Sequence, residues 1–72
     1  MNVYTATYRD RHDDIFSMHD CDGPINEAEL GALNHADSVE METRTKVYRV
    51  ELRLNLELCS ELSYRDTQGN IV

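Results

Sequence analysis

The sequence contains no tryptophan, one phenylalanine, one proline and only three glycines. With so few large apolar side chains among 72 residues, a deep, water-excluding active site is hard to build. No apolar stretch approaches the ~20 residues that cross a bilayer, and no basic start leads into an apolar run. The sequence therefore predicts no transmembrane segment, no signal peptide and a cytoplasmic location.

Positive charge is scarce as well, with seven Lys and Arg against fourteen Asp and Glu, and a net charge of −7. Ten of the acids lie between residues 10 and 42, where Arg11 is the only base. Direct binding to nucleic acid needs clustered Lys and Arg, so the composition argues against it. An acidic field attracts basic surfaces and cations, although acidity can also serve only to keep a small protein in solution.

Only two cysteines are present, Cys21 and Cys59, and without a secretion signal they are expected to be reduced thiols. A disulfide between them is the alternative. The residues that could supply zinc ligands are His12, His19, Cys21, His35 and Cys59. Their spacing lacks the paired C-x₂-C units of zinc fingers, so the sequence predicts no metal and no cofactor.

Catalytic patterns are missing too. The sequence has no glycine-rich phosphate loop, and a Cys21 nucleophile beside His12 or His35 would lack a visible activating context. Carboxylates are plentiful, but nothing indicates that one is buried with a raised pKa. The prediction is a protein without catalytic residues, not an enzyme.

What is present is regular alternation of apolar and polar residues. In VYRVELRLNLELC, residues 47–59, one apolar residue in every two predicts a long strand with one buried face. SVEMETR, residues 38–44, alternates in the opposite phase, which predicts a hairpin with 47–59. NVYTATYR, residues 2–9, is rich in strand formers, and Tyr4, Ala6 and Tyr8 share one face.

The segment 26–36 is expected to be a short helix. Asn26 and Glu29 fit a capping box, Ile25 and Leu30 fit a hydrophobic staple, and Leu30 and Leu33 can face the core. Residues 10–24 are expected to form a loop, and 62–72 a frayed end or short strand with a turn at 66–69.

These elements predict a single α+β domain spanning residues 1–72. It consists of an antiparallel sheet of three to four strands with one short helix packed on one face, over Leu52, Leu54 and Leu56. One helix covers a long strand incompletely, so a second copy could pack there or pair along an edge. We expect a homodimer, with Tyr48 and Leu52 as the dimer or edge contacts.

The stretch FSMHDCDGPINEAEL, residues 16–30, resembles an EF-hand calcium loop. Asp20, Asp22, Gly23, Ile25 and Glu29 stand at the family's spacing. The first ligand position falls on Met18, whose thioether is a poor ligand for a hard cation, and no second copy exists. A Gly23–Pro24 turn followed by a helix cap explains these residues with fewer exceptions.

The function that the sequence favours is a small acidic, non-enzymatic binding protein. It would occupy a basic surface of a host protein, such as the nucleic-acid groove of a nucleic-acid-binding protein or nuclease, with carboxylates replacing phosphates. Size and charge are analogous to phage and mobile-element inhibitors such as anti-restriction and anti-CRISPR proteins. The predicted partner-binding residues are Asp13, Asp14, Asp20, Asp22, Glu27, Glu29, Glu40 and Glu42.

Two alternatives remain open from the sequence. One is a structural or assembly module that pairs through its sheet edge and tyrosines. The other is a calcium- or zinc-binding module that uses residues 18–29.

Overall fold

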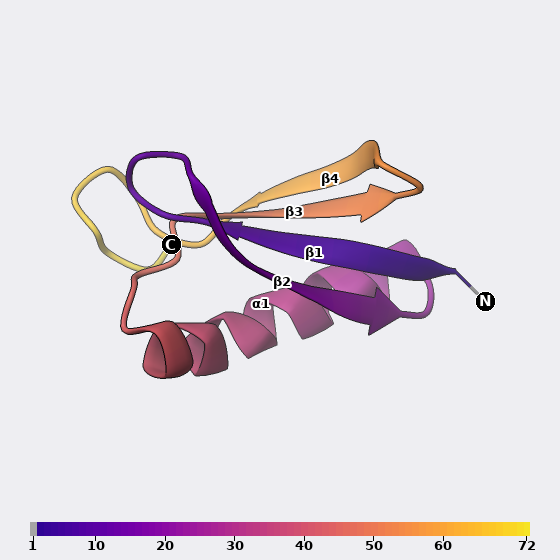
Figure 1. Ribbon diagram of the computed structural model, residues 1–72, viewed down its shortest axis with the longest axis horizontal. Coiled ribbons are helices and arrows are strands. Elements are labelled where there is room, and N and C mark those ends of the chain that lie inside the picture. Colours follow the sequence, from indigo (N-terminus) through magenta and orange to yellow (C-terminus); the bar gives the residue numbers. More distant parts are fainter. Residues whose placement is uncertain (1) are drawn as a thin grey trace.

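The computed structural model describes residues 2–72. Its elements are β1 (Val3–Arg9), β2 (Ile15–Asp22), α1 (Ile25–Thr43), β3 (Arg49–Leu54) and β4 (Glu57–Ser63). The strands form one antiparallel sheet in the order β2-β1-β3-β4, and α1 lies against one face (Figure 1). The predicted α+β class, with one helix on a four-stranded antiparallel sheet, is confirmed.

Strand β1 forms where the sequence predicts it and lies inside the sheet between β2 and β3. Tyr4, Ala6 and Tyr8 are buried on the helix side, as their alternation predicts. The helix connects β2 to β3, so that β3 pairs with β1 and not with its predecessor along the chain. The first strand is therefore the centre of the fold.

The prediction of a loop over residues 10–24 is wrong for most of its length. Residues 15–22 form β2, which pairs with β1 from Val3 opposite Asp22 to Arg9 opposite Ile15, with a register shift near Tyr8. Strand β2 lies at the edge of the sheet, where charged side chains are compatible with a strand and blunt edge-to-edge pairing. Because this segment is acidic, its sequence did not indicate a strand.

The helix begins at Ile25 after Pro24, and no side chain caps its first turn. The predicted capping box is wrong because Asn26 lies inside the helix, and Glu29 accepts a hydrogen bond from Ser60 on β4. Leu30 is 63% exposed, so it neither forms the predicted hydrophobic staple with Ile25 nor faces the core. Leu33 does pack against the core, as predicted.

The helix also continues to Thr43, so the predicted strand over 38–44 is wrong. Its buried positions are Ala28, Ala32, Ala36 and Val39. Because they are spaced by four, four and three residues, these side chains lie on one side of the helix, which packs against the sheet. The alternation of Val39, Met41 and Thr43 is coincidental, since Met41 is 75% exposed. Arg44, whose φ of 57° is left-handed, is the C-cap that terminates the helix after Thr43.

The predicted strand over 47–59 is two strands, β3 and β4, which pair as a hairpin. The chain reverses at Asn55 and Leu56, whose φ angles of 50° and 73° are both positive. Two central residues with positive φ are characteristic of the type I′ hairpin turn. Consequently Leu52 is buried beneath the helix, whereas Leu56 is 90% exposed at the tip of the turn.

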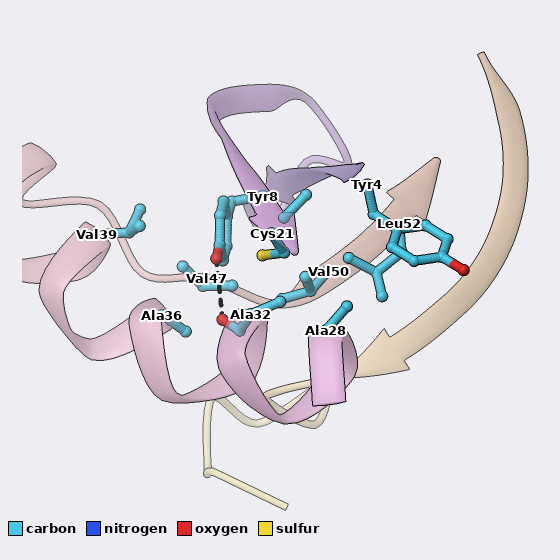
Figure 2. Packing of buried hydrophobic residues seen from close by; sticks show 11 residues of the cluster. Tyr4, Tyr8, Cys21, Ala28, Ala32, Ala36, Val39, Val47, Val50 and Leu52 are labelled. Carbon is cyan, nitrogen blue, oxygen red and sulfur yellow. Dashed lines mark hydrogen bonds between the residues drawn. The ribbon is translucent and has the colours of Figure 1, made fainter. Parts of the chain in front are cut away.

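The core lies between α1 and the helix-facing side of the sheet (Figure 2). The three buried alanines let the helix approach closely, and Tyr8 Oη donates a hydrogen bond to the Ala32 carbonyl at 2.9 Å. Val47, Val50 and Leu52 have no exposed surface. The small side chains on the helix are therefore matched by larger side chains on the strands.

The C-terminal segment folds back toward Tyr48. Gly69 N–H donates to Asp66 O at 3.0 Å, which confirms the predicted turn at 66–69, and Arg65 forms an isolated bridge with Ile71. Across residues 2–72, α1 is the only helix, and it is not a long apolar helix of the kind that crosses a membrane.

Candidate functional site

The sheet has one face that α1 leaves uncovered, which we call the open face. Because Tyr4, Ala6 and Tyr8 point toward the helix, Thr5, Thr7 and Arg9 of the same strand point the other way. In the register of the sheet, Thr7 lies between Met18 on β2 and Glu51 on β3. Thr7 and Glu51 are each only 3% exposed although no secondary-structure element covers them.

Glu51 is buried under arginine side chains. Its Oε1 accepts a hydrogen bond from Arg9 Nε at 2.8 Å and lies 3.5 Å from Arg53 Nη2. Arg49 Nη2 is 4.0 Å from Glu51 Oε2 and 2.8 Å from Asp13 Oδ1. The cluster thus joins β1, β3 and the β1–β2 loop.

The charges of this cluster hold Glu51 ionised. Burial alone would raise the pKa of Glu51, but the hydrogen bond and charge of Arg9, with the charges of Arg53 and Arg49, outweigh burial and lower that pKa. The hydrogen bond to Glu51 in turn raises the pKa of Arg9. A carboxylate held ionised is a poor general acid, and we assign this cluster a structural role.

Three of the eight predicted partner-binding carboxylates are engaged inside the protein. Asp13 pairs with Arg49, Glu29 accepts from Ser60, and Glu40 pairs with Arg65. Glu40 and Glu42 belong to the segment 38–44 that was predicted as a strand, and they lie instead near the end of α1. Glu40 also accepts a hydrogen bond from Val47 N–H at 2.7 Å.

The other five predicted residues are exposed: Asp14, Asp20, Asp22, Glu27 and Glu42. Asp20 and Asp22 stand two residues apart on edge strand β2 and project from the open face, opposite Thr5 and Val3. Residues at this spacing in a strand are ~6–7 Å apart. An ideal Cβ on Gly23 would lie 3.2 Å from Glu27 Oε2, so Glu27 turns back toward the end of β2. We call Asp20, Asp22 and Glu27 the β2 carboxylates.

Ion pairing engages most of the bases but few of the acids. Within residues 2–72, ion pairs engage four of the seven cations but only three of the fourteen acids. The engaged residues are Arg9, Arg49, Arg53 and Arg65 with Asp13, Glu40 and Glu51. The three remaining cations, Arg11, Arg44 and Lys46, lie in the β1–β2 loop and the segment before β3.

Three of the five residues considered as zinc ligands lie together between β2 and α1. Cys21 Sγ is 3.4 Å from His19 Nε2, and the rings of His19 and His35 have centroids 4.0 Å apart. Burial raises the pKa of the Cys21 thiol, with Asp20 and Asp22 adding to the effect. A nucleophile or metal ligand needs the thiolate, which this environment disfavours. His12 and Cys59 lie elsewhere, on the β1–β2 loop and β4.

The segment that resembles a calcium loop does not fold as one. Asp20 and Asp22 belong to β2, Gly23 lies in the short connection, and Glu29 points to Ser60 from the second turn of α1. In the part of the chain that the structure describes, no three His, Cys, Asp or Glu side chains are grouped to hold a metal ion.

Tyr48 and Leu52, the predicted dimer or edge contacts, differ in their surroundings. Leu52 is fully buried on interior strand β3 and offers no surface to another chain, so this part of the prediction is wrong. Tyr48 is half-buried just before β3 and lines two hollows on the surface.

Sequence reasoning missed the Glu51 cluster. Its signal was present in RVELR, where Arg49, Glu51 and Arg53 occupy alternate positions and therefore share one strand face. The contribution of Arg9 was not readable, because it depends on β1 pairing with β3.

Comparison of the chain with protein-family models, with curated proteins and with solved structures finds no match.

Proposed function

We propose that this protein is a non-enzymatic binding protein that engages a basic surface of another protein through the β2 carboxylates. The partner surface would be one that normally binds nucleic acid, with Asp20, Asp22 and Glu27 taking the place of phosphates. Inhibitors of nucleic-acid enzymes in phages and mobile elements are the functional class that this chemistry suits.

The observation that carries the proposal is that the β2 carboxylates form no ion pairs within residues 2–72. Asp20, Asp22 and Glu27 are exposed and form none of the ion pairs within residues 2–72. When a cationic partner binds them, the main free-energy cost is thus the loss of the water that hydrates these carboxylates. Carboxylates already bonded inside the protein, such as Glu40, would lose existing interactions and are poor candidates.

The position of these residues also supports the proposal. They lie at one end of the molecule, where β2 leads into α1 (Figure 1). The cations outside ion pairs lie in segments at the opposite ends of β1 and α1. This separation orients the protein in the field of a basic partner and speeds electrostatically steered association.

The test is capture of partners from a host lysate with the tagged protein, washed at low and at high salt. We expect a nucleic-acid-binding protein or nuclease that high salt releases. The variant Asp20→Asn/Asp22→Asn should lose that protein. With the purified pair, the variant should weaken binding and flatten its dependence on salt concentration.

The matched control is Asp37→Asn/Glu42→Gln, which removes the same charge from exposed positions on α1. Its binding should stay close to wild type. Equal loss in both variants would mean that only net charge matters, and unchanged binding in Asp20→Asn/Asp22→Asn would refute the proposal.

We further propose that the protein acts in the cytoplasm, where the free thiols of Cys21 and Cys59 would stay reduced. Homodimer formation and edge pairing stay predictions. Because Leu52 is buried, such pairing would use the outer edges of β2 or β4 and would resist high salt.

A further inference from the structure

Two hollows open on the surface beside Tyr48 and Arg11, which line both of them. One, of about 430 Å³, is lined by Asp10, Arg11, His12, Thr45, Lys46 and Tyr48. The other, of about 520 Å³, is lined by Arg11, Tyr48, Arg65, Asp66, Thr67 and Gln68. The β1–β2 loop, the segment before β3 and the C-terminal loop that form them lie at one end of the molecule (Figure 1).

The smaller hollow brings together two of the three cations outside ion pairs in residues 2–72, Arg11 and Lys46. The carboxylate of Asp10 also lines this hollow but forms none of these ion pairs, and its Oδ1 accepts the N–H groups of His12 and Asp14 at 2.9 and 3.0 Å. The guanidinium of Arg11 and the ammonium of Lys46 therefore keep their donors for an anion.

Beside the charged side chains of Arg11, Arg65 and Asp66, the larger hollow offers two neutral polar side chains. Asp66 Oδ1 accepts the N–H groups of Gln68 and Asn70 at 2.9 and 3.0 Å, and Arg65 is bonded to Glu40. Thr67 and Gln68 remain as hydrogen-bonding side chains beside the ring of Tyr48. This combination suits a planar polar ring and not a second charge.

Tyr48 is held firmly by its backbone. Its N–H donates to Arg9 O at 2.8 Å, and its carbonyl accepts the N–H groups of Tyr64 and Arg65 at 3.0 and 3.3 Å. A Cβ on Gly69, whose φ is 87°, would lie 3.2 Å from Tyr48 Oη. The glycine thus leaves room for the phenol at the larger hollow.

We propose that these two hollows bind one small phosphorylated compound of nucleotide size. Arg11 and Lys46 hold the phosphate in the smaller hollow, and the planar ring stacks on Tyr48 in the larger one. The volumes fall within the ~300–1,000 Å³ range of small-ligand sites. A long nucleic acid is a poor occupant, because the eleven Asp and Glu side chains that form no ion pair within residues 2–72 would repel its further phosphates.

The experiment is an NMR titration of the full chain, labelled with ¹⁵N, with AMP at constant ionic strength. We expect saturable shifts of amides at 10–12, 45–48 and 66–69. Adenosine should bind more weakly, since it lacks the phosphate. Inorganic phosphate should shift mainly the amides around Arg11 and Lys46.

The variant Arg11→Gln/Lys46→Gln should raise the Kd for AMP at least about tenfold. The control Arg44→Gln removes the third cation outside ion pairs, which lines neither hollow, and should bind AMP like wild type.

Four results would overturn the proposal. These are no saturable shift up to about 10 mM AMP, adenosine binding equal to AMP, equal weakening by Arg44→Gln, and tighter binding of a single-stranded RNA oligomer than of AMP. The comparison of AMP with adenosine uses the wild-type protein, so it decides the role of the phosphate even if the double variant does not fold.

Discussion

Arg65 donates two hydrogen bonds to the Glu40 carboxylate, from Nε at 2.9 Å and from Nη2 at 2.8 Å. The same carboxylate accepts Val47 N–H at 2.7 Å. The pair therefore joins α1 to the segment before β3 and to the C-terminal loop, where Arg65 Nη1 also donates to Gly69 O. Both side chains are largely buried, with 13% and 15% of their surfaces exposed.

Replacing Glu40 by Gln should lower the free energy of unfolding by about 2–3 kcal/mol at neutral pH, because Arg65 would lose its charged partner. Urea denaturation measures this change. Glu42→Gln, two residues along α1 and exposed, is the control and should change stability by less than about 0.5 kcal/mol. If both variants lost the same free energy of unfolding, the Glu40–Arg65 pair would make no specific contribution to stability.

The wild-type protein should also lose this contribution in acid. The hydrogen bond from Arg65 lowers the pKa of Glu40, and Val47 N–H adds to the effect against burial. The unfolded state then binds the proton more tightly, so the stabilisation is present above the unfolded pKa of ~4.3 and is lost as pH falls below it. Glu40→Gln should show a smaller fall in stability between neutral pH and about pH 3 than wild type.

The His19 imidazole should make stability depend on pH in a higher range. Burial lowers its pKa and the nearby His35 adds to this, whereas Asp20 opposes it. The groups that face it are Tyr8, Cys21 and His35. Because the unfolded state protonates first, stability should fall as pH drops through the unfolded value of ~6.5. Thermal melts between about pH 7.5 and 5.5 measure the fall, and His19→Gln should reduce it.

Leu56→Gly should stabilise the protein by about 1 kcal/mol. Leu56 is 90% exposed and has a φ of 73°. This positive φ is unfavourable for an L-residue that carries a side chain, but not for glycine. The change creates Asn-Gly at the β3–β4 turn, the preferred pair for a type I′ turn. Leu56→Ala keeps the unfavourable φ and should bring little gain. Equal melting temperatures of Leu56→Gly and wild type would contradict the strain argument.

Gly31→Ala should also stabilise, by up to about 1 kcal/mol, since Gly31 lies inside α1 and an added Cβ would meet nothing within 4 Å. Gly23→Ala should have the opposite sign, because Gly23 has a φ of 102° and its Cβ would approach Glu27 Oε2 to 3.2 Å. Both variants add the same methyl group. Comparing their free energies of unfolding therefore separates the effect of backbone conformation from the effect of the added methyl group. A loss in Gly31→Ala would refute the open space seen on that side of the helix.

The part of the candidate site that could be predicted is the part that depends on neighbours in the chain. The alternation in HDCD indicates that Asp20 and Asp22 share a strand face, once residues 15–22 are recognised as a strand. The engagement of Asp13, Glu29 and Glu40 could not be predicted, since their partners Arg49, Ser60 and Arg65 lie 25 or more residues away.

By itself the sequence determined the α+β class, the first strand, the acidic surface and the C-terminal turn. It also predicted a helix start at residue 26, one residue after the observed start at Ile25. All of these depend on composition or on patterns within about ten residues. Only the tertiary structure decided the length of α1, the strand character of 15–22 and the reversal at Asn55–Leu56. Local propensity is weak at those places, and burial against β1 and the alanine face of α1 selects among conformations of similar local energy.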